Sequence, residues 1–425
     1  MMLVLLLIAN YIFYALFDIR ALAVLIAMSL VTYIGGRIVS ALIKAGRDSA
    51  AKITCMVFIA FQIIVLCFFK YSRTVSLPVG MSFYMLMAIS FIADCRRGEF
   101  DEIPGLIETL AYISFFPTVI SGPIQKAKDF IPQMHNRKRL TKERLYSFMS
   151  VFLFGAFAKL VMADRLAVAV DKVYSAPLVF SGMTLFVTSI TYSLQLFFDF
   201  AGYSYMAIAV ATLLGFDLTP NFNLPYMATN PSDFWRRWHI SLSEWLRDYV
   251  YIPLGGSRRG QARTYINILL VMVVSGLWHG STVNFLIWGL LHGIGQMVHR
   301  IVSGRCNKDA AAHKSRRILS MIINFLFVDF LWIPFRASTP SEAFTIFTRI
   351  VTLRPGASYY YVYTFIFGII LLIVQFAGAR YRGGNDPLRP LPLDRLYAKI
   401  IFCTLVIVTA MFAYFGNGAF IYSQF

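Results

Sequence analysis

Two histidines lie in a part of the sequence that is otherwise apolar. Residues 274–295 read VSGLWHGSTVNFLIWGLLHGIG and contain His279 and His292. An ionisable side chain in such surroundings is costly to bury and is a functional candidate by default, and imidazole titrates near neutral pH, which suits a general base. Gly276 and Gly280 flank His279 and would let a ligand or a second chain approach it. We therefore expect His279 to be functional.

The surroundings of His292 predict a structural residue. Gly289 and Gly293 lie on either side of it, and small residues at this spacing favour close packing of two helices in a membrane. A histidine at such a contact is expected to hydrogen-bond across it. We therefore interpret His292 as a packing residue.

A third histidine, His239, lies in a segment rich in tryptophan and arginine. Residues 230–260 read NPSDFWRRWHISLSEWLRDYVYIPLGGSRRG, and Ser232 or Asp233 after Pro231 is typical of a helix start. The spacing predicts one helix with a single apolar-aromatic stripe, made of Phe234, Trp238, Leu242, Trp245 and Tyr249. Such a helix is typical of a membrane interface. His239 lies beside the stripe, where a histidine is more often packed and hydrogen-bonded than catalytic.

The elements that position these histidines must cross a membrane. The chain has 425 residues, of which 58% are hydrophobic and 14% are charged, whereas soluble domains carry about 25% charged residues. Its 39 Phe, 23 Tyr and 6 Trp also exclude disorder. At roughly 20 residues per crossing, the composition predicts an all-α polytopic membrane protein with about ten to twelve transmembrane or re-entrant helices.

Apolar runs give the expected positions of these helices. The run at 183–215 is long enough for a span plus a return, and 105–124 is interrupted by Pro117, Gly122 and Pro123. A break at membrane depth is tolerated only where the backbone is buried in protein or lines a cavity, so we expect a broken or re-entrant segment there. The other runs are 1–17, 21–36, 53–69, 77–94, 147–170, 264–278, 283–299, 318–335, 358–378 and 399–415.

The excess of basic residues predicts the sidedness of the loops. The 39 Lys and Arg against 21 Asp and Glu give a formal charge of +18, which could indicate a nucleic-acid partner. In a membrane protein, cytoplasmic loops rich in Lys and Arg are the better explanation. Basic residues cluster at 125–144, 233–263, 300–317 and 380–399. With these loops in the cytoplasm, His279 lies where two spans turn back on the outer side. We expect one integral membrane domain over residues 1–425, in the cell membrane.

The sequence predicts neither a metal site nor a resident cofactor. Its five cysteines form no CxxC pair, so neither a zinc site nor a disulfide framework is indicated. We also find no Walker loop, no GxSxG elbow and no cluster of metal-ligand residues.

Several long motifs, in order along the chain, resemble the membrane-bound O-acyltransferase (MBOAT) family. They are LPVGMSFYMLMAISFIADC (77–95), FFPTVISGPIQKAKDF (115–130), LFFDFAGYS (196–204), DFWRRWHISLSEWLRDYVYIPLGGSRRG (233–260), GLWHGSTVNFLIWGLLHG (276–293) and FLWIPFRA, which ends at residue 337. The match is to the bacterial branch that acylates polysaccharides. It is nearest to the alginate O-acetyltransferase membrane subunits and next to the proteins that transfer D-alanine to lipoteichoic acid.

The resemblance implies a function and roles for individual residues. His279 matches the presumed catalytic histidine of the family, and His239 matches its partner across a tunnel through the bilayer. Acetyl-CoA would be a donor substrate rather than a permanent cofactor, held through its phosphates by a basic cytoplasmic mouth that draws on the 125–144 cluster and on Arg236, Arg237, Arg258 and Arg259. An oxyanion donor would be His239 or an amide near Ser121–Gly122.

The acceptor and the donor remain open at the level of sequence. The acetyl group would pass to an extracytoplasmic polysaccharide hydroxyl, or to a serine of an SGNH-type partner that passes it on. Membrane lipids would surround the protein, and no nucleic acid is expected. One alternative is transfer of D-alanine or another acyl group from a carrier protein to teichoic acid. A second is a transport or scaffold subunit of a polysaccharide export complex without enzymatic activity.

Overall fold

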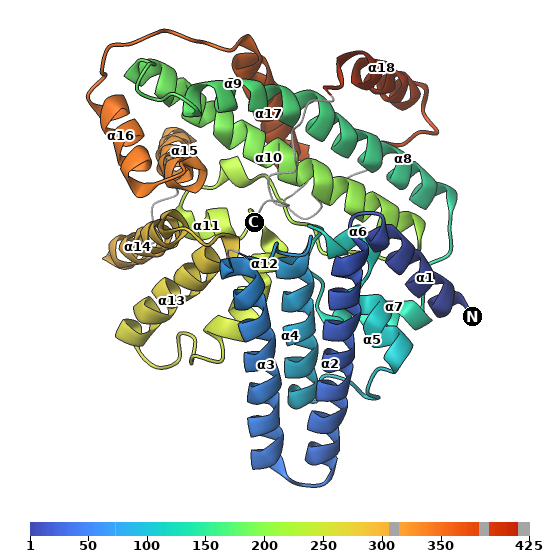
Figure 1. Ribbon diagram of the computed structural model, residues 1–425. Coiled ribbons are helices and arrows are strands. Elements are labelled where there is room, and N and C mark those ends of the chain that lie inside the picture. The colour runs from blue at the N-terminus through green and yellow to red at the C-terminus, as the bar shows by residue number, and fades with distance from the viewer. Residues whose placement is uncertain (73, 306–313, 382–390, 415–425) are drawn as a thin grey trace. The chain divides into compact units, whose positions relative to one another are not determined.

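The protein is helical throughout the part of the chain that the structure describes (Figure 1). The computed structural model describes residues 1–72, 74–305, 314–381 and 391–414. Within these ranges no strand forms, and extended pairing is limited to isolated bridges at Phe180–Ala357 and Phe222–Trp238. The predicted all-α class is therefore confirmed. The central parts of the predicted basic loops at 300–317 and 380–399 lie outside the described residues.

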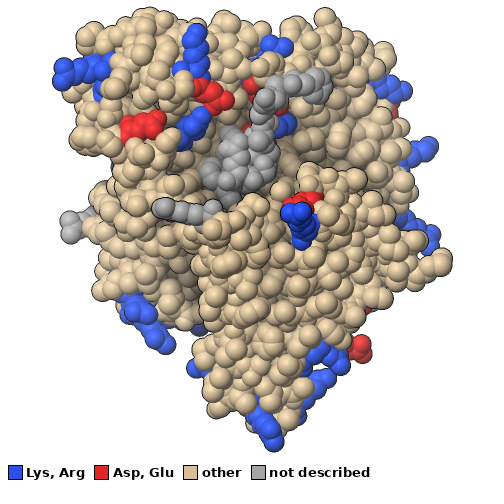
Figure 2. All heavy atoms as spheres, in the orientation of Figure 1, with Lys and Arg blue, Asp and Glu red and all other residues tan. Residues whose placement is uncertain are grey.

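Long apolar helices confirm a polytopic membrane protein. Five helical stretches in the described residues are long and apolar enough to cross a bilayer: Ile19–Lys44 (α2), Asp48–Tyr71 (α3), Lys142–Tyr174, Gly182–Leu213 (α10) and Ser315–Arg336. Shorter apolar helices include Met2–Ala15 (α1) and Leu396–Phe412 (α18). Figure 2 shows wide uncharged areas between the Lys and Arg side chains, as expected for surface in contact with lipid.

One prediction about the spans is wrong. The run at 183–215 was expected to hold a span plus a return, but α10 is a single helix of 32 residues. At about 1.5 Å per residue it is longer than a bilayer core is thick. The run contains Gly202 but no proline, and a Cβ at Gly202 would lie 2.7 Å from the Gly155 carbonyl oxygen. This glycine therefore serves close packing rather than a turn.

The described residues group into two compact units. The first comprises Met1–Phe152 and Ser204–Thr219, and the second comprises Leu153–Tyr203 and the described residues from Pro220 onward. Each is described by itself below. The organisation as one membrane domain over residues 1–425 stays a prediction.

The first unit contains the predicted broken segment. After α1, α2 and α3 come α4 (Met81–Arg97), α5 (Leu106–Ile113), the one-turn α6 (Phe116–Val119) and α7 (Ala127–His135). The break between α5 and α6 is buried, and Asn10 of α1 supports it. The Asn10 amide donates to the Ala111 carbonyl at 3.2 Å and its oxygen accepts from the Phe116 N–H at 3.1 Å. The predicted interruption is confirmed, with its backbone buried in protein as required.

The second unit begins at a distorted helix with a buried ionic cluster. α8 (Lys142–Phe157) continues through a π-helical turn at Ala158–Ala163 into α9 (Asp164–Tyr174). At this turn the Lys159 ammonium lies 2.7 Å from Asp164 and 2.5 Å from Asp199 of α10. These charged side chains are therefore paired with one another within apolar segments.

Two helices form a tight hairpin in the second unit. α13 (Gln261–His279) is followed by α14 (Val283–Arg305), so His279 ends one helix directly before the turn, as predicted. A Cβ at Gly276 would lie 2.2 Å from the Phe285 carbonyl oxygen, and one at Gly289 would lie 2.3 Å from the Met272 carbonyl oxygen. Gly276 and Gly280 were predicted to let another chain or a ligand approach His279 closely, and the segment that approaches is α14, because a Cβ at Gly280 would lie 2.0 Å from the Phe285 ring. These glycines bring α14 against α13.

The tryptophan-rich segment is not one helix, which corrects a second prediction. It consists of α11 (Pro231–Trp235), α12 (Ile240–Leu246) and a π-helical turn at Arg247–Tyr251. Residues 221–223 run antiparallel to its middle. The Asn223 N–H donates to the Arg237 carbonyl at 2.9 Å and the Ile240 N–H donates to the Asn221 carbonyl at 3.0 Å. This pairing interrupts the helix before His239, and Trp238 and Trp245 are buried in the core rather than at an interface.

The remaining helices of this unit are α15 (Lys314–Arg336), α16 (Pro340–Val351), α17 (Val362–Tyr381) and α18. α15 and α16 pack against α14, whereas α17 packs against α9 and α18 packs against the π-helical turn at Ala158–Ala163. Asp329 of α15 accepts hydrogen bonds from Ser189 and Ser193 of α10 at 2.8 and 2.5 Å. These two hydrogen bonds tie α15 to α10.

Candidate active site

His239 occupies an unusual backbone position at the start of α12. Its φ of +46° and ψ of +52° lie in the left-handed region, which residues other than Gly adopt uncommonly, although Asn, Asp and His are enriched there. The side chain is completely buried. Its ring packs edge-on against Phe200 of α10, with the ring centroids 4.6 Å apart. The interrupted helix therefore turns this imidazole into the protein interior.

His279 faces His239 from the end of α13. The two ring centroids are 6.3 Å apart, and His279 is 2% exposed. Aromatic rings surround His279 with centroids at 4.9 to 5.3 Å, namely Trp278, Trp288 and Phe335. Sequence analysis named both histidines as candidates, and the fold brings them together although 40 positions separate them.

The spacing of the two imidazoles suits acid–base chemistry on a small group between them. A hydrogen bond to an imidazole nitrogen spans about 3 Å, so two nitrogens that share reacting atoms stand about 5–6 Å apart. The observed 6.3 Å between ring centroids is compatible with that spacing. The aromatic walls keep water away, which strengthens electrostatic interactions with a developing charge.

His292 lies apart from this pair, in an aromatic cage. It is completely buried, with the rings of Trp288 and Trp235 at 4.9 and 5.0 Å. Its packing role agrees with the prediction. The expected hydrogen bond is absent, because in the described part of the chain neither ring nitrogen has a hydrogen-bond partner.

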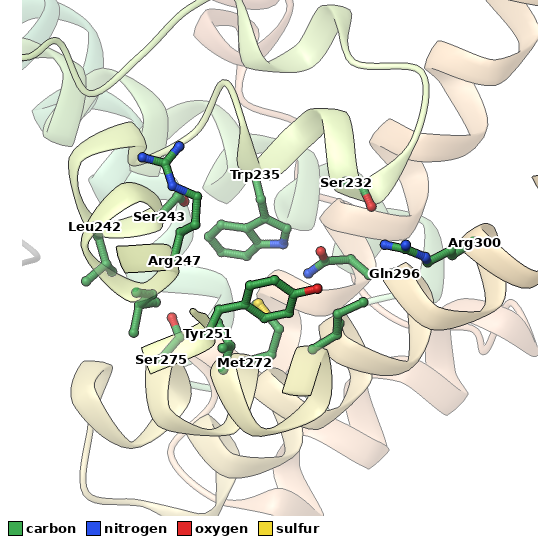
Figure 3. Close-up of a pocket in the computed structure, with 13 residues that line it drawn as sticks. Ser232, Trp235, Leu242, Ser243, Arg247, Tyr251, Met272, Ser275, Gln296 and Arg300 are labelled. Carbon is green, nitrogen blue, oxygen red and sulfur yellow. The ribbon is translucent and has the colours of Figure 1, made fainter. Parts of the chain in front are cut away.

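A pocket of about 250 Å³ lies in the same unit (Figure 3), and neither His239 nor His279 is among the residues that line it. It lies between α11, α12, the turn at Arg247–Tyr251, α13 and α14. Two of its lining residues lie one helical turn from the histidines: Ser243 follows His239 by four residues, and Ser275 precedes His279 by four residues. The Ser243 N–H donates to the His239 carbonyl at 3.0 Å, and Ser275 shares a helix face with His279 because the two are four residues apart.

Two arginines border the pocket, and neither was singled out from the sequence. Arg247 and Arg300 are among its lining residues. Arg247 is 55% exposed and lies 2.7 Å from Asp248, and this hydrogen bond raises the pKa of Arg247 above its ordinary value. The sequence feature that could have indicated Arg247 and Arg300 is their position in the predicted basic loops at 233–263 and 300–317. Many other arginines have the same kind of position.

The four arginines predicted to bind the donor lie elsewhere in the same unit. Arg236 is 73% exposed and lies 3.7 Å from Asp233, and Arg237 donates to Asp233 at 3.0 Å. Arg258 and Arg259 are exposed in the turn before α13. None of the four is among the residues that line the described pocket, and their role in donor binding stays a prediction.

The part of the chain that contains the histidines and the pocket matches a known protein family. The model of a family described as MBOAT, membrane-bound O-acyltransferase family, matches residues 55–337. That range contains both histidines and every residue that lines the pocket.

Three curated proteins illustrate the similarity. A probable alginate O-acetylase, AlgI, of Pseudomonas aeruginosa is 34% identical over 365 residues, which is 81% of this chain and 68% of that protein. A peptidoglycan O-acetyltransferase of Helicobacter pylori is 34% identical over 304 residues, or 65% of this chain and 57% of that protein. A teichoic acid D-alanyltransferase of Bacillus subtilis is 31% identical over 268 residues, or 59% of this chain and 67% of that protein.

Proposed function

The chain belongs to the membrane-bound O-acyltransferase family, and on that premise we propose that it transfers an acetyl group from cytoplasmic acetyl-CoA to an extracytoplasmic hydroxyl. Membership makes it an acyltransferase and a multi-pass membrane protein, which removes the alternative of a transport or scaffold subunit without activity. The acceptor is a polysaccharide hydroxyl, or a serine of an SGNH-type partner that hands the acetyl group on.

The observation that carries the proposal is the buried pair His239 and His279, with ring centroids 6.3 Å apart, in the unit that also contains the pocket. His279 takes the proton of the acceptor hydroxyl as its oxygen attacks the thioester carbon. His239 donates a hydrogen bond to the oxyanion that forms. The C–S bond then breaks, the thiolate takes the proton from His279, and an ester remains on the acceptor.

The pocket supports entry of the donor from the cytoplasmic side. Arg247 and Arg300 border it, and both belong to loops whose basic excess predicts a cytoplasmic position. Guanidinium groups suit the phosphates of coenzyme A. Arg236, Arg237, Arg258 and Arg259 lie in the same predicted cytoplasmic region and remain candidates for outer phosphate contacts.

The comparisons favour acetyl over D-alanyl transfer. The relatives named as O-acetylases or O-acetyltransferases are 34% identical over 81% and 65% of this chain, whereas the D-alanyltransferase is 31% identical over 59%. The names of the first two also favour a cell-envelope or secreted polysaccharide as the acceptor. Transfer of D-alanine from a carrier protein is the second candidate.

A vesicle assay tests the proposal and separates the two candidates. The purified protein is placed in lipid vesicles with acetyl-CoA on one side and acetylatable polysaccharide, with or without an SGNH-type partner, on the other. Release of free thiol and acetyl ester on the acceptor are measured. We expect acetyl-CoA to be consumed and His279→Ala to reduce the rate by about 10²–10⁴-fold. Consumption of D-alanyl carrier protein instead of acetyl-CoA would establish the second candidate.

A further inference from the structure

Two connections between helices are fixed to each other at the predicted outer end of the second unit. They are 175–181, between α9 and α10, and 352–361, between α16 and α17. α15 leads from the predicted cytoplasmic loop to α16, which places these connections on the other side of the membrane. The Ser181 N–H donates to the Ala357 carbonyl at 3.0 Å, and the Arg349 guanidinium donates to one carbonyl of each connection, at 2.8 and 3.0 Å.

The second connection carries a row of tyrosine rings into the start of α17. Residues 359–363 read YYYVY, and Tyr359, Tyr361 and Tyr363 occupy alternate positions. The ring centroids of Tyr359 and Tyr361 are 6.5 Å apart with their planes at 17°, and those of Tyr361 and Tyr363 are 5.2 Å apart. All three residues are partly exposed. The Tyr359 N–H donates to the Thr184 hydroxyl of α10 at 3.1 Å, so the row begins at a fixed backbone.

Two cations of α9 lie over the two ends of this row. The Lys172 ammonium is 4.1 Å from the ring centroid of Tyr359, and the Arg165 guanidinium is 5.4 Å from that of Tyr363, which are cation–π distances. The two cations are seven residues apart, so they share a face of α9. Within the described residues neither forms an ion pair with a carboxylate, because the neighbouring Asp171 is held by another arginine at 2.7 Å.

These properties fit a carboxylated glycan better than a lipid. A pyranose ring has an apolar C–H face that packs against the electron-rich face of an aromatic ring, and a chain of sugars can use several such rings in a row. Guanidinium and ammonium groups bind carboxylates. A lipid headgroup supplies an anion but no ring to stack, and tyrosines that only mark the membrane interface need neither a fixed connection nor alternate positions.

We propose that the tyrosine row, with Lys172 and Arg165 along it, binds a polysaccharide of uronic acids on the outer side of the membrane. The sugar rings stack on Tyr359, Tyr361 and Tyr363, and their carboxylates lie at the two cations. This inference rests on the proposed function, because it names the chemical class of the polysaccharide that receives the acetyl group. The row would hold that chain at the enzyme whether the acetyl group reaches it directly or through an SGNH-type partner.

Equilibrium binding in the absence of any acyl donor tests the row. The full-length protein in lipid nanodiscs is titrated with an alginate oligosaccharide, which is a chain of uronic acids, and with the neutral, carboxyl-reduced form of the same oligosaccharide. Tyr361→Ala and Tyr363→Ala should each raise Kd for both glycans about two- to tenfold, the range for one aromatic contact. Tyr361→Phe keeps the ring and should bind as the wild type does. Lys172→Gln should raise Kd about two- to fivefold for the carboxylated glycan only.

Tyr360 provides the matched control in the same segment. It lies between two members of the row in the sequence and is 51% exposed, but in the described structure its ring packs on none of the three. Tyr360→Ala should therefore leave Kd unchanged for both glycans. Thermal unfolding of every variant identifies losses of binding that come from misfolding.

The other outcomes separate this inference from its competitors and from the proposed function. Unchanged Kd in Tyr361→Ala and Tyr363→Ala, or an equal loss in Tyr360→Ala, would overturn it. Equal affinity of the wild type for the two glycans would refute the role of the cations. Loss of an SGNH-type partner in the tyrosine variants at unchanged glycan affinity would make the row a protein-docking surface instead. Glycan binding through the row by a protein that consumes no acetyl-CoA would refute the proposed donor and still support this inference.

Discussion

At the scale of single residues, the backbone of His239 adds to what its side chain indicates. A left-handed conformation costs most residues about 1–2 kcal/mol, and such strain is often found at functional sites. Here the antiparallel pairing of residues 221–223 with the chain before α12 holds the conformation. The strain is therefore consistent with a ring that must point at His279.

Three substitutions at His239 separate its backbone role from its chemical role. Asparagine tolerates the left-handed region and keeps an N–H donor, glycine tolerates it without a donor, and alanine provides neither. We expect His239→Asn to keep the most activity, and His239→Gly to fold equally well but to lose about 10²–10³-fold, as when an oxyanion donor is removed. Melting temperature and kcat of the three variants are compared. Equal kcat for the Asn and Gly variants would leave His239 with a backbone role only.

His279 and His292 of the hairpin should respond differently to alanine. His279→Ala should lose about 10²–10⁴-fold in acyl transfer with unchanged expression and melting temperature. His292→Ala empties part of an aromatic cage and should lower stability by about 2–5 kcal/mol, with activity retained below its melting point. The assay is acetyl transfer by purified variants in lipid. If His279→Ala keeps more than a tenth of the wild-type rate, well above the acid–base expectation, His279 is not the base.

Sequence reasoning found the histidines but not the other residues that line the pocket. His239 and His279 stand out because they are ionisable within apolar sequence. Trp235 and Ser275 do not, since a tryptophan or a serine in an apolar helix is ordinary core. Their lack of partners arises only when α11, α13 and α14 assemble around the pocket.

At the scale of elements, the hairpin of α13 and α14 depends on glycines at its crossing. A Cβ at Gly276 would lie 2.2 Å from a backbone oxygen, which cannot move aside as a side chain can. Gly276→Ala should lower stability by about 1–3 kcal/mol or more, as overpacking does, and should reduce activity because His279 shifts. Thermal unfolding and initial rates are measured together.

A glycine elsewhere gives the matched control. A Cβ at Gly368 of α17 would lie 3.6 Å from a Leu194 methyl group, an ordinary contact. Because glycine costs about 1 kcal/mol relative to alanine in a helix, Gly368→Ala should be neutral or stabilising. A loss of stability as large as that of Gly276→Ala would show that these helices tolerate no added methyl group, whatever the local space.

The contact of α10 with α15 depends on a buried acid that was not singled out from the sequence. Asp329 lies in the apolar run 318–335 and is completely buried, with Ser189 and Ser193 as its hydrogen-bond donors. Asp329→Asn keeps an acceptor and should be tolerated. Asp329→Leu leaves the Ser193 hydroxyl without this partner, whereas Ser189 keeps the Phe186 carbonyl at 2.8 Å. The substitution should cost about 1–3 kcal/mol. Thermal unfolding of the two variants measures the difference, and equal stability would remove the role of these bonds.

The sequence predicts the helices in the apolar runs, but it does not predict the break in the segment at 230–260. Each predicted apolar run contains a helix, because continuous apolar sequence in a membrane must satisfy its backbone internally. In the segment at 230–260 the aromatic residues have helical spacing in the sequence on both sides of the break at His239. That break results from pairing with residues 221–223, a contact that periodicity within the segment does not report.

At the scale of the whole molecule, the proposed reaction requires its two substrates to arrive from opposite sides. The pocket is bordered by Arg247 and Arg300 of the predicted cytoplasmic loops. His279 is the last of the 19 residues of α13, which places it about 27 Å from the start of that helix at 1.5 Å per residue. A donor entering past the arginines would therefore present its thioester to a histidine near the turn that is predicted to face outside.

Native Cys306 gives a direct test of this sidedness. It lies in the basic loop at 300–317, outside the described residues. A variant that keeps Cys306 and lacks Cys55, Cys67, Cys95 and Cys403 should react with a membrane-impermeant maleimide in inside-out vesicles but not in right-side-out vesicles. In the same background without Cys306, Thr352→Cys, an exposed position after α16, should show the reverse pattern, because one membrane-spanning helix, α15, separates the two sites. Labelling of Cys306 from outside would invert the hairpin and place the turn at His279 on the cytoplasmic side. The acceptor would then have to enter through the pocket, and the assignment of Arg300 to the donor's phosphate would be wrong.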